Sequence, residues 1–516
     1  MLKRVTALAA AATLTVLATA PGAAAARATP AGADITVGSA VANTVAPGAI
    51  GANTPFWNPL LTRSDTPDLI RKAGIRTLSF NAGGPSDLYH FAGGGWLSPD
   101  PNGPENGGFQ GLTPRFSFDR FAQIARAAHA GMLVHVNYGT GPTDTKADPS
   151  TPEHPKPGDP NEAAAWVRYA NRSHHYHVRD WVIGEETYRN GWHPTPPGLP
   201  RQPDAHPDKT PAAYGRNSLA YARAMKAVDP SIRIGIELAT YDPAKTDRPG
   251  IDRYAKQWDD AVLATPGLAA AVDFADIHWY HAARSGSDAA VLADTAATGP
   301  ALRTLRADLD RAAGPRHRIG IVVGETNSGA LGAPQQTGAV GALYLLDNNL
   351  TLLESGASAV DWWALYNGPN STPDGGWGDL GLLSSGTCPA DQPGRTGCEP
   401  PAGTPFAPYY TLQMLTTALK DGGSLLTTTT SGSEALSAHA VRRADGTLAV
   451  VALNKDPRHA QRIRLTVPRG YHAVRTLTWE PDDAIAPTAH PARAARTSRA
   501  PQSLAPYSAA VVLYER

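Results

Sequence analysis

The sequence predicts a (β/α)8 barrel of the TIM type that carries an accessory antiparallel β-sandwich at its C-terminal side. Between residues 46 and 420, short apolar runs alternate with helix patterns about eight times. Such strand–helix units give parallel strands joined by right-handed crossovers. After residue 420 the helix patterns stop, and short alternating runs separated by turn residues follow. Those runs are typical of an antiparallel sandwich.

The barrel is predicted from the order of its elements. Its strands are expected at residues 49–52, 75–81, 132–138, 180–186, 232–239, 274–280, 319–325 and 357–365. The helix patterns cover residues 66–73, 118–130, 161–171, 212–228, 251–263, 300–313 and 335–354, with a last helix at 408–419. Eight units in succession favour a closed barrel over an open sheet.

The domain division follows from length and from the change of pattern. A chain of 516 residues is too long for one ordinary hydrophobic core. We expect a leader at residues 1–26, an N-terminal segment at 27–45 that pairs with the sandwich, the barrel at 46–420 and the sandwich at 421–516. Strands of the sandwich are expected at residues 434–441, 448–454, 461–467 and 509–514.

The N-terminus has the pattern of a secretory signal peptide. Lys3 and Arg4 precede an apolar stretch at residues 5–20, and small residues follow at 23–26. We therefore expect cleavage near Ala26, a secreted extracellular protein and no membrane association after cleavage. The alternative, an uncleaved anchor, would need a longer apolar run.

Charge and cysteine content narrow the possible partners. Acidic and basic residues both number 46, and a net charge of zero argues against nucleic acid or an anionic membrane as partner. Cys388 and Cys398 lie in one loop, and in an oxidising compartment we expect them to form a local disulfide. No further metal ligand lies near them in the sequence, so neither a metal site nor a cofactor is expected. The oligomeric state is not indicated.

Polar and aromatic residues gather at the ends of the expected strands, where this fold places its active groups. The fourth strand ends on Glu185 and Glu186, the sixth on His278 and Tyr280, and the seventh on Glu325. The other candidates for ligand binding are Asn53, Asp87, Asn137, Trp192 and Trp363. Acids and amides bind sugar hydroxyl groups, and indole faces stack on sugar C–H surfaces. A solvated or ion-paired role for each acid, and core packing for Trp363, stay open.

Two acids facing each other across a barrel mouth suit glycoside hydrolysis. The fourth and seventh strands lie nearly opposite each other, so Glu186 and Glu325 can bracket one sugar. One acid must be protonated to assist the leaving oxygen, and the other must be ionised to attack the anomeric carbon, at a retaining separation of about 5–5.5 Å. Tyr280 is in position to donate a hydrogen bond to Glu325.

Residues 181–192, WVIGEETYRNGW, resemble the acid/base segment of clan A glycoside hydrolases, and of family 51 α-L-arabinofuranosidases in particular. Further segments resemble that family at residues 81–89 (NAGGPSDLY), 136–141 (VNYGTG), 161–171 (NEAAAWVRYAN), 277–280 (IHWY), 324–329 (GETNSG) and 450–457 (VVALNKDP). The resemblance implies that Glu186 is the general acid/base and Glu325 the nucleophile. It also implies that Tyr280 contacts the nucleophile, and that Asn137 and Asp87 line the pocket.

The sequence departs from the family pattern at three places. Glu185 stands where the family has an asparagine that binds the sugar's 2-hydroxyl group; we expect it to accept that hydrogen bond and to raise the pKa of Glu186. The first-strand segment GANTPFWN lacks an acidic sugar-binding residue, and the loop at 81–89 lacks a preceding arginine. Because side chains alternate along a strand, we expect only one acid of the 185–186 pair to face the cleft.

The expected function is that of a secreted retaining glycoside hydrolase, exo-acting on the side chains of polysaccharides or oligosaccharides and similar to an α-L-arabinofuranosidase. Carbohydrate is the expected partner. One alternative is a clan A glycosidase of other specificity, for a β-xyloside, β-glucuronide or galactoside. Another is a barrel that binds carbohydrate without catalysis.

Overall fold

The computed structural model describes residues 33–516 except 81–82, 104–108, 110–111, 143–154, 193–200, 240–248, 281–285, 316, 330–332, 372–376, 389–397, 483–490, 492 and 497–498. The leader expected at residues 1–26 lies outside the described residues. None of the described helices is both long and apolar enough to cross a bilayer.

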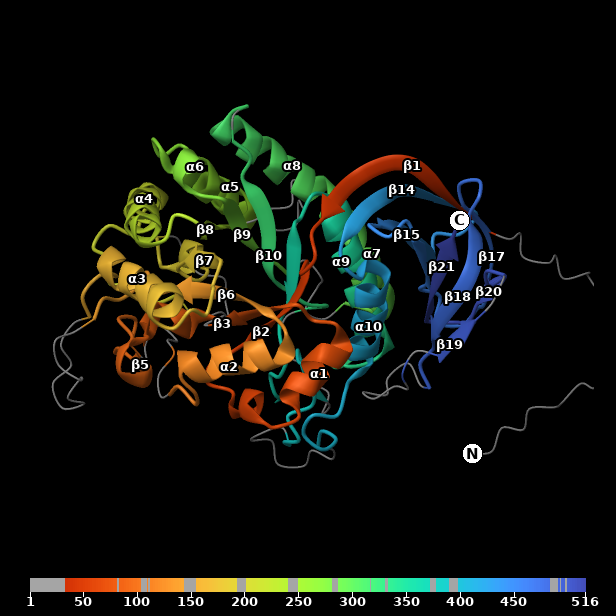
Figure 1. The fold of residues 1–516 in the computed structure, drawn as a ribbon, viewed down its shortest axis with the longest axis horizontal. Coiled ribbons are helices and arrows are strands. Elements are labelled where there is room, and N and C mark those ends of the chain that lie inside the picture. The colour runs from red at the N-terminus through yellow and green to blue at the C-terminus, as the bar shows by residue number, and fades with distance from the viewer. Residues whose placement is uncertain are drawn as a thin grey trace, which may run out of the picture. The chain divides into compact units, whose positions relative to one another are not determined.

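Eight parallel strands close into a barrel, which confirms the predicted fold class (Figure 1). Each strand pairs with the next one along the chain, and the last pairs with the first. The strands are β2 (Ile50–Thr54), β3 (Thr77–Phe80), β6 (Gly131–Val136), β7 (Asp180–Ile183), β8 (Arg233–Leu238), β9 (Phe274–Trp279), β10 (Gly320–Thr326) and β11 (Ala359–Trp362).

Every predicted helix is present. The helices are α1 (Thr66–Ala73), α2 (Phe118–Ala128), α3 (Pro160–Val167), α4 (Pro211–Val228), α5 (Pro249–Leu263), α8 (Thr295–Ala313), α9 (Ala339–Glu354) and α10 (Ala407–Leu419). Local signals fix their ends: the Ser117 side chain accepts a hydrogen bond from the Arg120 amide at the start of α2, and Gly74 ends α1 in a left-handed conformation. The helix pattern at 161–171 divides into α3 and a π-helical turn, Arg168–Ser173.

Short elements complete the connections. Two small hairpins are formed by β4 (Tyr89–His90) with β5 (Trp96–Leu97) and by β12 (Asn370–Ser371) with β13 (Trp377–Gly378). The short helices are α6 (Leu268–Ala271), α7 (Asp288–Ala293), η1 (Pro59–Thr62), η2 (Gly84–Leu88), η3 (Ala92–Gly94), η6 (Thr187–Arg189) and η7 (Pro334–Gln336).

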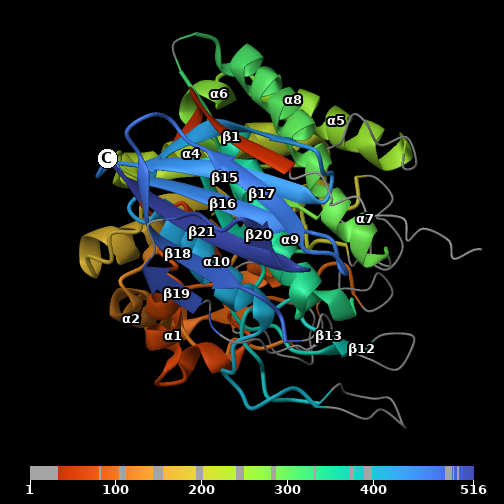
Figure 2. The same ribbon diagram turned by 90° about the vertical axis from the view of Figure 1, so that its right-hand side faces the viewer.

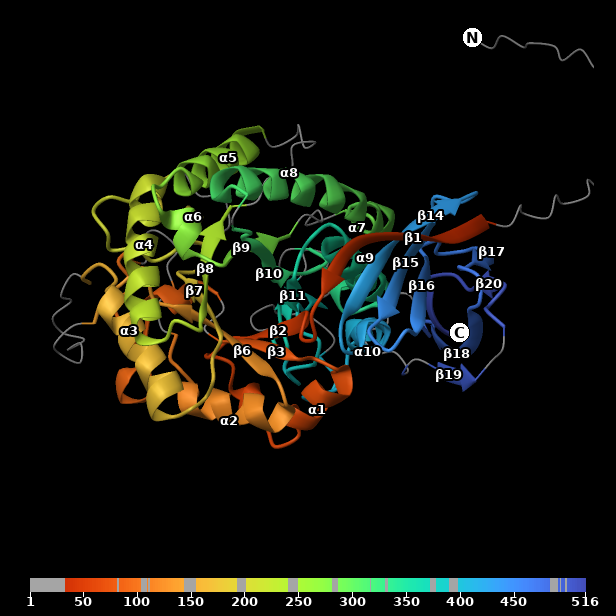
Figure 3. The same cartoon turned by 45° about the horizontal axis from the view of Figure 1, so that its top comes forward.

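The accessory domain is one nine-stranded sheet (Figure 2). Its order is β19-β18-β21-β16-β15-β14-β1-β17-β20, and only the β1–β17 pair is parallel among the described strands. The strands are β1 (Ala33–Val45), β14 (Gly423–Ser431), β15 (Leu436–Arg443), β16 (Leu448–Asn454), β17 (Gln461–Thr466), β18 (His472–Trp479), β19 (Arg493–Arg496), β20 (Ser503–Leu504) and β21 (Ser508–Glu515). The N-terminal strand β1 runs antiparallel to β14, as Figure 3 shows.

The sheet curls so that its strands pack against one another in two layers. One apolar cluster joins Ile35 of β1 and Ile463 of β17 to Ala438 of β15 and Ala510 of β21. The two layers of the predicted sandwich are therefore parts of a single sheet. Burial of these apolar side chains stabilises the accessory domain.

A buried ion-pair network connects α9 of the barrel to the accessory sheet. Asp347 is 2% exposed and accepts hydrogen bonds from Lys455 Nζ at 2.6 Å and His439 Nε2 at 3.0 Å. His439 Nδ1 lies 2.9 Å from Glu354 Oε1. Burial opposes the charge on His439, but Glu354 and Asp347 outweigh it and raise its pKa to about 10. A groove of about 900 Å³ beside this network contains none of the strand-end acids.

The network predicts a pH-dependent contribution to stability. Because the pKa of His439 is raised on folding, its contribution is complete below about pH 6.5 and is lost as the pH rises toward 10. We expect His439→Gln to lower the free energy of unfolding by about 2 kcal/mol at pH 6, and to reduce the fall in Tm between pH 7 and pH 10. Thermal unfolding monitored by circular dichroism measures both effects.

The matched control is His459→Gln, which replaces an exposed histidine of the same domain. This variant should keep the wild-type Tm and pH profile. A pH profile of His439→Gln that superimposes on that of the wild type would contradict the assignment.

Candidate active site

Three carboxylates from two strand ends surround one imidazole. His278, on β9, places Nδ1 3.3 Å from Glu186 Oε1, 3.4 Å from Glu325 Oε2 and 3.9 Å from Glu185 Oε1. Glu186 Oε1 and Glu325 Oε2 therefore lie within about 7 Å of each other, a bound that includes the separation of about 5–5.5 Å found in retaining glycosidases. The structure brings together the two acids that the sequence singles out.

The turn after β7 explains why both adjacent acids reach the site. The strand ends at Ile183, and the backbone then adopts positive φ at Gly184 (84°) and again at Glu186 (42°). Side chains no longer alternate once the chain leaves the extended conformation. The expectation that only one acid of the pair faces the site is therefore wrong: Glu185 and Glu186 both approach His278.

Glu186 is held by three side chains besides His278. Tyr188 donates its hydroxyl to Oε1 at 3.1 Å, Gln202 donates Nε2–H to Oε2 at 2.9 Å, and Arg189 forms an ion pair with Oε2. The Glu186 side chain is 15% exposed. Burial raises its pKa, but Arg189 and His278 outweigh burial and hold the pKa far below its usual range. The expected increase in the pKa of Glu186 is therefore wrong, because the positive neighbours dominate.

Glu325 lies at the end of β10, and its side chain is 9% exposed. Tyr280, which directly follows β9, donates its hydroxyl to Glu325 Oε2 at 2.8 Å. Burial raises the pKa of Glu325 well above its usual range, while the charge of His278 and the Tyr280 hydrogen bond act in the opposite direction. The predicted contact between Tyr280 and Glu325 is present.

Glu185 is the most deeply buried of the three acids, with 1% exposure. Its Oε2 lies 3.0 Å from His135 Nδ1, and its backbone N–H donates to Asp87 Oδ2 at 3.2 Å. Burial raises the pKa of Glu185 to about 8. The donor atoms of Glu185, His278 and Glu325 all lie within 4.8 Å of one another.

Asp87 and Asn137 support the site through contacts with backbone groups. Asp87 is fully buried, and besides Glu185 it accepts a hydrogen bond from the Tyr138 amide at 2.8 Å. Asn137 donates Nδ2–H to the Tyr89 carbonyl at 3.2 Å. Both side chains thus bind backbone groups of the loops that follow β3, β6 and β7. In this structure they position the site and do not present free polar groups to a ligand.

Asn53 is buried and binds the backbone, whereas Trp363 and Trp192 are partly exposed. Asn53 is fully buried and donates Nδ2–H to the carbonyl of Gly324 at 2.8 Å, directly before the Glu325 strand end. Trp363 is half-buried, with its ring centroid 6.3 Å from that of Trp57. The ring of Trp192 contacts the rings of Tyr254 and Trp258, at centroid distances of 5.2 and 6.1 Å.

The barrel interior beneath the site is acidic, a feature that the strand-end pattern does not predict. The buried members are His135, Glu237, Asp276 and Asp361. His135 lies between two of them, with Nδ1 3.8 Å from Glu237 Oε1 and Nε2 3.8 Å from Asp276 Oδ2. The available signal was the position of Glu237 and Asp276 inside the apolar runs at 232–239 and 274–280.

Three sets of donor atoms are close enough to surround a cation among the described residues: His135–Glu185–Glu237, Glu185–His278–Glu325 and Glu237–Asp276–His278. We assign no metal to them, because His278 already supplies a positive charge. Burial opposes that charge, but Glu325 and the other acids around the ring outweigh it and raise the pKa of His278 well above its usual range.

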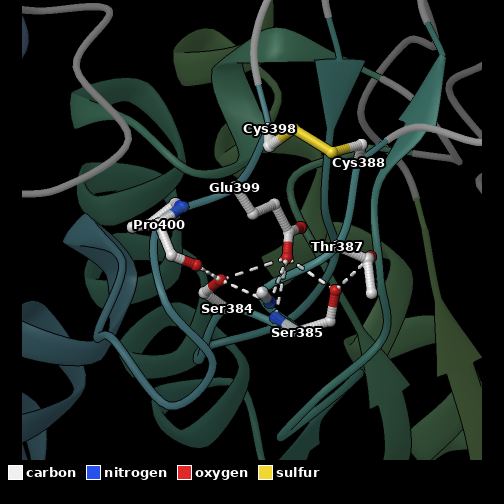
Figure 4. Close-up of a disulfide and its surroundings, with 8 residues drawn as sticks. Ser384, Ser385, Thr387, Cys388, Cys398, Glu399 and Pro400 are labelled. Atoms are coloured by element: carbon white, nitrogen blue, oxygen red, sulfur yellow. Dashed lines mark hydrogen bonds between the residues drawn. A yellow bond between two sulfur atoms is a disulfide. The ribbon is translucent and has the colours of Figure 1, made fainter.

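The loop after β11 is stapled by the Cys388–Cys398 disulfide, as predicted (Figure 4). Next to it, Glu399 Oε2 accepts hydrogen bonds from the Ser385 amide at 2.7 Å and the Ser384 hydroxyl at 3.1 Å. Asn327, two residues after Glu325, donates Nδ2–H to the Leu380 carbonyl of the same loop at 3.0 Å. The loop is thereby fixed against the end of β10.

Comparison with known proteins gives structural neighbours only: no family model and no curated protein matches the sequence. An α-L-arabinofuranosidase from Thermotoga maritima is 17% identical with a TM-score of 0.68, over 93% of this chain and 99% of that chain. A family 51 α-L-arabinofuranosidase from Bifidobacterium longum is 14% identical with a TM-score of 0.68, over 95% and 100%. A family 44 xyloglucanase from Paenibacillus polymyxa is 12% identical with a TM-score of 0.60, over 94% and 99%.

At these identities the similarity concerns the fold. The chain has the barrel and the C-terminal β-domain of family 51 hydrolases, and its neighbours also include family 44 enzymes. The resemblance to clan A glycoside hydrolases, inferred from motifs at the strand ends, is consistent with this outcome.

Removal of Arg189 from its ion pair with Glu186 should lower the stability of the protein by an amount that depends on pH. Because the folded pKa of Glu186 is lowered, the pair stabilises the fold above the unfolded value of about 4.5, and this contribution is lost as the pH falls. We expect Arg189→Met to lower the free energy of unfolding by about 3 kcal/mol near pH 7, since a buried charge loses its partner. The deficit in Tm should shrink below pH 4. Thermal unfolding from pH 3 to pH 7 tests this.

Arg216→Met is the matched control, because it removes an exposed arginine that pairs with Asp208. It should change Tm little at any pH. An equal deficit for Arg189→Met at pH 3 and pH 7 would show that packing, and not charge, is lost.

Proposed function

We propose that the protein is a retaining glycoside hydrolase in which Glu325 is the nucleophile and Glu186 the general acid/base. The observation that carries this proposal is the convergence of the two carboxylates on His278, with the Tyr280 hydroxyl bound to Glu325. The acids come from β7 and β10, which are separated by β8 and β9 around the barrel. A sugar held between them would meet one acid on each side of its anomeric carbon.

The reaction proceeds in two displacements. In the first, a Glu325 oxygen attacks the anomeric carbon, the glycosidic C–O bond breaks, and Glu186 gives its proton to the leaving oxygen. In the second, Glu186 takes a proton from water, the water oxygen attacks the same carbon, and the bond to Glu325 breaks. The Tyr280 hydroxyl and the positive charge of His278 stabilise the ionised form of the Glu325 carboxylate and hold it in position.

The ion pair with Arg189 sets a condition on the first step. In the unliganded protein Arg189 keeps Glu186 ionised, which suits its role as base. To act as an acid, Glu186 must take up a proton and leave Arg189. Substrate binding that displaces Arg189 from Oε2 would raise the pKa of Glu186 toward the range that proton donation needs.

The structural neighbours and the surroundings of the site support a proposal for the substrate class. We propose exo-action on arabinofuranosyl side chains of polysaccharides or oligosaccharides, because the neighbours include α-L-arabinofuranosidases that align over almost their full length. Partly exposed Trp57 and Trp363 offer ring faces for sugar C–H groups. The leader pattern and the disulfide support a secreted protein.

A second candidate is a glycosidase of the same mechanism with another substrate. Neighbours with the same fold include a xyloglucanase and a bifunctional glucanase–xylanase. Glu185 replaces the asparagine of the family 51 pattern, so contacts with the sugar differ at that position. β-Xylosides, β-glucuronides and galactosides are the alternatives that a substrate panel should include.

The primary test is hydrolysis of a panel of aryl glycosides by the wild type, Glu325→Gln and Glu186→Gln. We expect Glu325→Gln to lower kcat by about 10⁴-fold or more. Glu186→Gln should lower kcat by about 10²–10⁴-fold with a poor leaving group. It should act almost normally on a good leaving group, which needs no proton, and azide should accelerate its second step. NMR of the first-formed sugar reports retention of configuration.

Glu434→Gln, at an exposed glutamate of the accessory domain, is the control and should match the wild type. Wild-type protein that binds sugars but hydrolyses none of the panel would favour the non-catalytic binding barrel. Full activity of Glu325→Gln would show that Glu325 is not the nucleophile.

Tyr280→Phe tests the support of the nucleophile. Loss of the hydroxyl removes a hydrogen bond to the ionised form of Glu325, so its pKa should rise and the acidic limb of kcat/KM should move to higher pH. We expect kcat to fall roughly 10–100-fold with a smaller change in KM. Tyr176→Phe, whose hydroxyl binds Asp119, is the control. An unchanged acidic limb would show that Tyr280 does not stabilise the charged nucleophile.

A further inference from the structure

Glu185 and Glu325 are too close, and too deeply buried, to carry two negative charges together. Their donor atoms lie within 4.8 Å of each other and of His278, and the two side chains are 1% and 9% exposed. Carboxylates this close in a site with little water repel each other, and such a pair keeps one proton. The retained proton must reside on one of the two acids.

The Tyr280 hydroxyl and the position of His278 favour Glu325 as the ionised partner. Tyr280 donates its hydroxyl to Glu325 Oε2 at 2.8 Å, and His278 Nδ1 lies 3.4 Å from the same oxygen. The corresponding distance from His278 to Glu185 is longer, at 3.9 Å. Donors that point at a carboxylate stabilise its charged form.

The surroundings of Glu185 are mostly acidic. The titratable groups around it are Asp87 of η2, His135 of β6, the adjacent Glu186, Glu237 of β8, Asp276 and His278 of β9, and Glu325 of β10. Burial lowers the pKa of His135, so that ring is a neutral neighbour of Glu185. His278 is then the cation of this group, and Glu186 and Glu325 share it.

We propose that Glu185 is a neutral carboxylic acid in the folded protein, and that it serves as a hydrogen-bond donor beside the Glu325 carboxylate. The link to catalysis rests on the proposed function, in which Glu325 must be ionised. Glu185 is a positioning residue in this scheme: it leaves a single negative charge on the nucleophile side of the site. A neutral amide could take its place, whereas an ionised group could not.

Burial raises the pKa of both acids, that of Glu185 to about 8 and that of Glu325 well above its usual range. Burial therefore does not distinguish the two acids. The assignment of the proton to Glu185 rests on the Tyr280 hydroxyl and on the position of His278.

The proposal has a thermodynamic consequence that does not require activity. An acid whose pKa rises from 4.5 to about 8 on folding releases its proton when the protein unfolds in that pH window. Stability must therefore fall as the pH rises through the window. A glutamine at position 185 carries no such proton and removes this part of the pH dependence.

The experiment compares wild type, Glu185→Gln and Glu185→Ala, with Glu434→Gln as the surface control. Tm is measured from pH 5 to pH 8.5, and kcat is measured on the aryl glycoside that the wild type hydrolyses best. We expect the Tm of Glu185→Gln to gain several degrees on the wild type between pH 5 and pH 8, while Glu434→Gln runs parallel to the wild type. We also expect the kcat of Glu185→Gln to exceed that of Glu185→Ala at least tenfold.

Each outcome decides one claim. Parallel Tm profiles of Glu185→Gln and wild type would overturn the neutral state of Glu185. A kcat of Glu185→Gln as low as that of Glu185→Ala would overturn its role as a donor. If the wild type hydrolyses nothing on the panel, the proposed function fails, and the Tm profiles still decide the protonation of Glu185.

Discussion

The positive charge of His278 is the interaction on which the site depends. Three carboxylates approach one ring nitrogen within 3.3–3.9 Å, in a region that is nearly closed to water. Without a nearby cation, the buried carboxylates would all hold their protons. They would then lack the differences in pKa that acid–base chemistry needs. The imidazolium of His278, together with Arg189 beside Glu186, allows neighbouring acids to hold different protonation states.

The barrel supplies the rigidity that this arrangement requires. Glu325 and His278 lie on adjacent paired strands, β10 and β9, and buried side chains fix the backbone next to each acid. Asn53 holds the Gly324 carbonyl, and Asp87 holds the Glu185 amide. Functional groups on strands with such support keep a more exact geometry than groups on loops. The support residues are polar and buried, which is why they resemble ligand-binding residues in the sequence.

Much of the fold could be predicted from the sequence, because the period of the apolar pattern distinguishes strands from helices. The convergence of Glu186, Glu325 and Tyr280 was also predictable, since parallel strands end at the same rim. The ion pair between Glu186 and Arg189 could not be predicted, because it depends on the left-handed turn at residues 184–186. Nor could the acidic interior of the barrel, because the sequence does not show that Glu237 of β8 and Asp276 of β9 lie side by side in paired strands.

Position 185 has a glutamate where the family 51 pattern has an asparagine. A protonated glutamate differs from asparagine in its chemistry, but both side chains are neutral. An asparagine there would be neutral at every pH, and a glutamate is neutral only where burial and nearby acids keep its proton in place. The barrel interior provides both conditions through Glu237, Asp276 and the closed surroundings of His135. The acidic interior and the glutamate at 185 therefore act together. Nearby acids disfavour the ionised form of Glu185, and for that reason they keep Glu185 protonated beside Glu325.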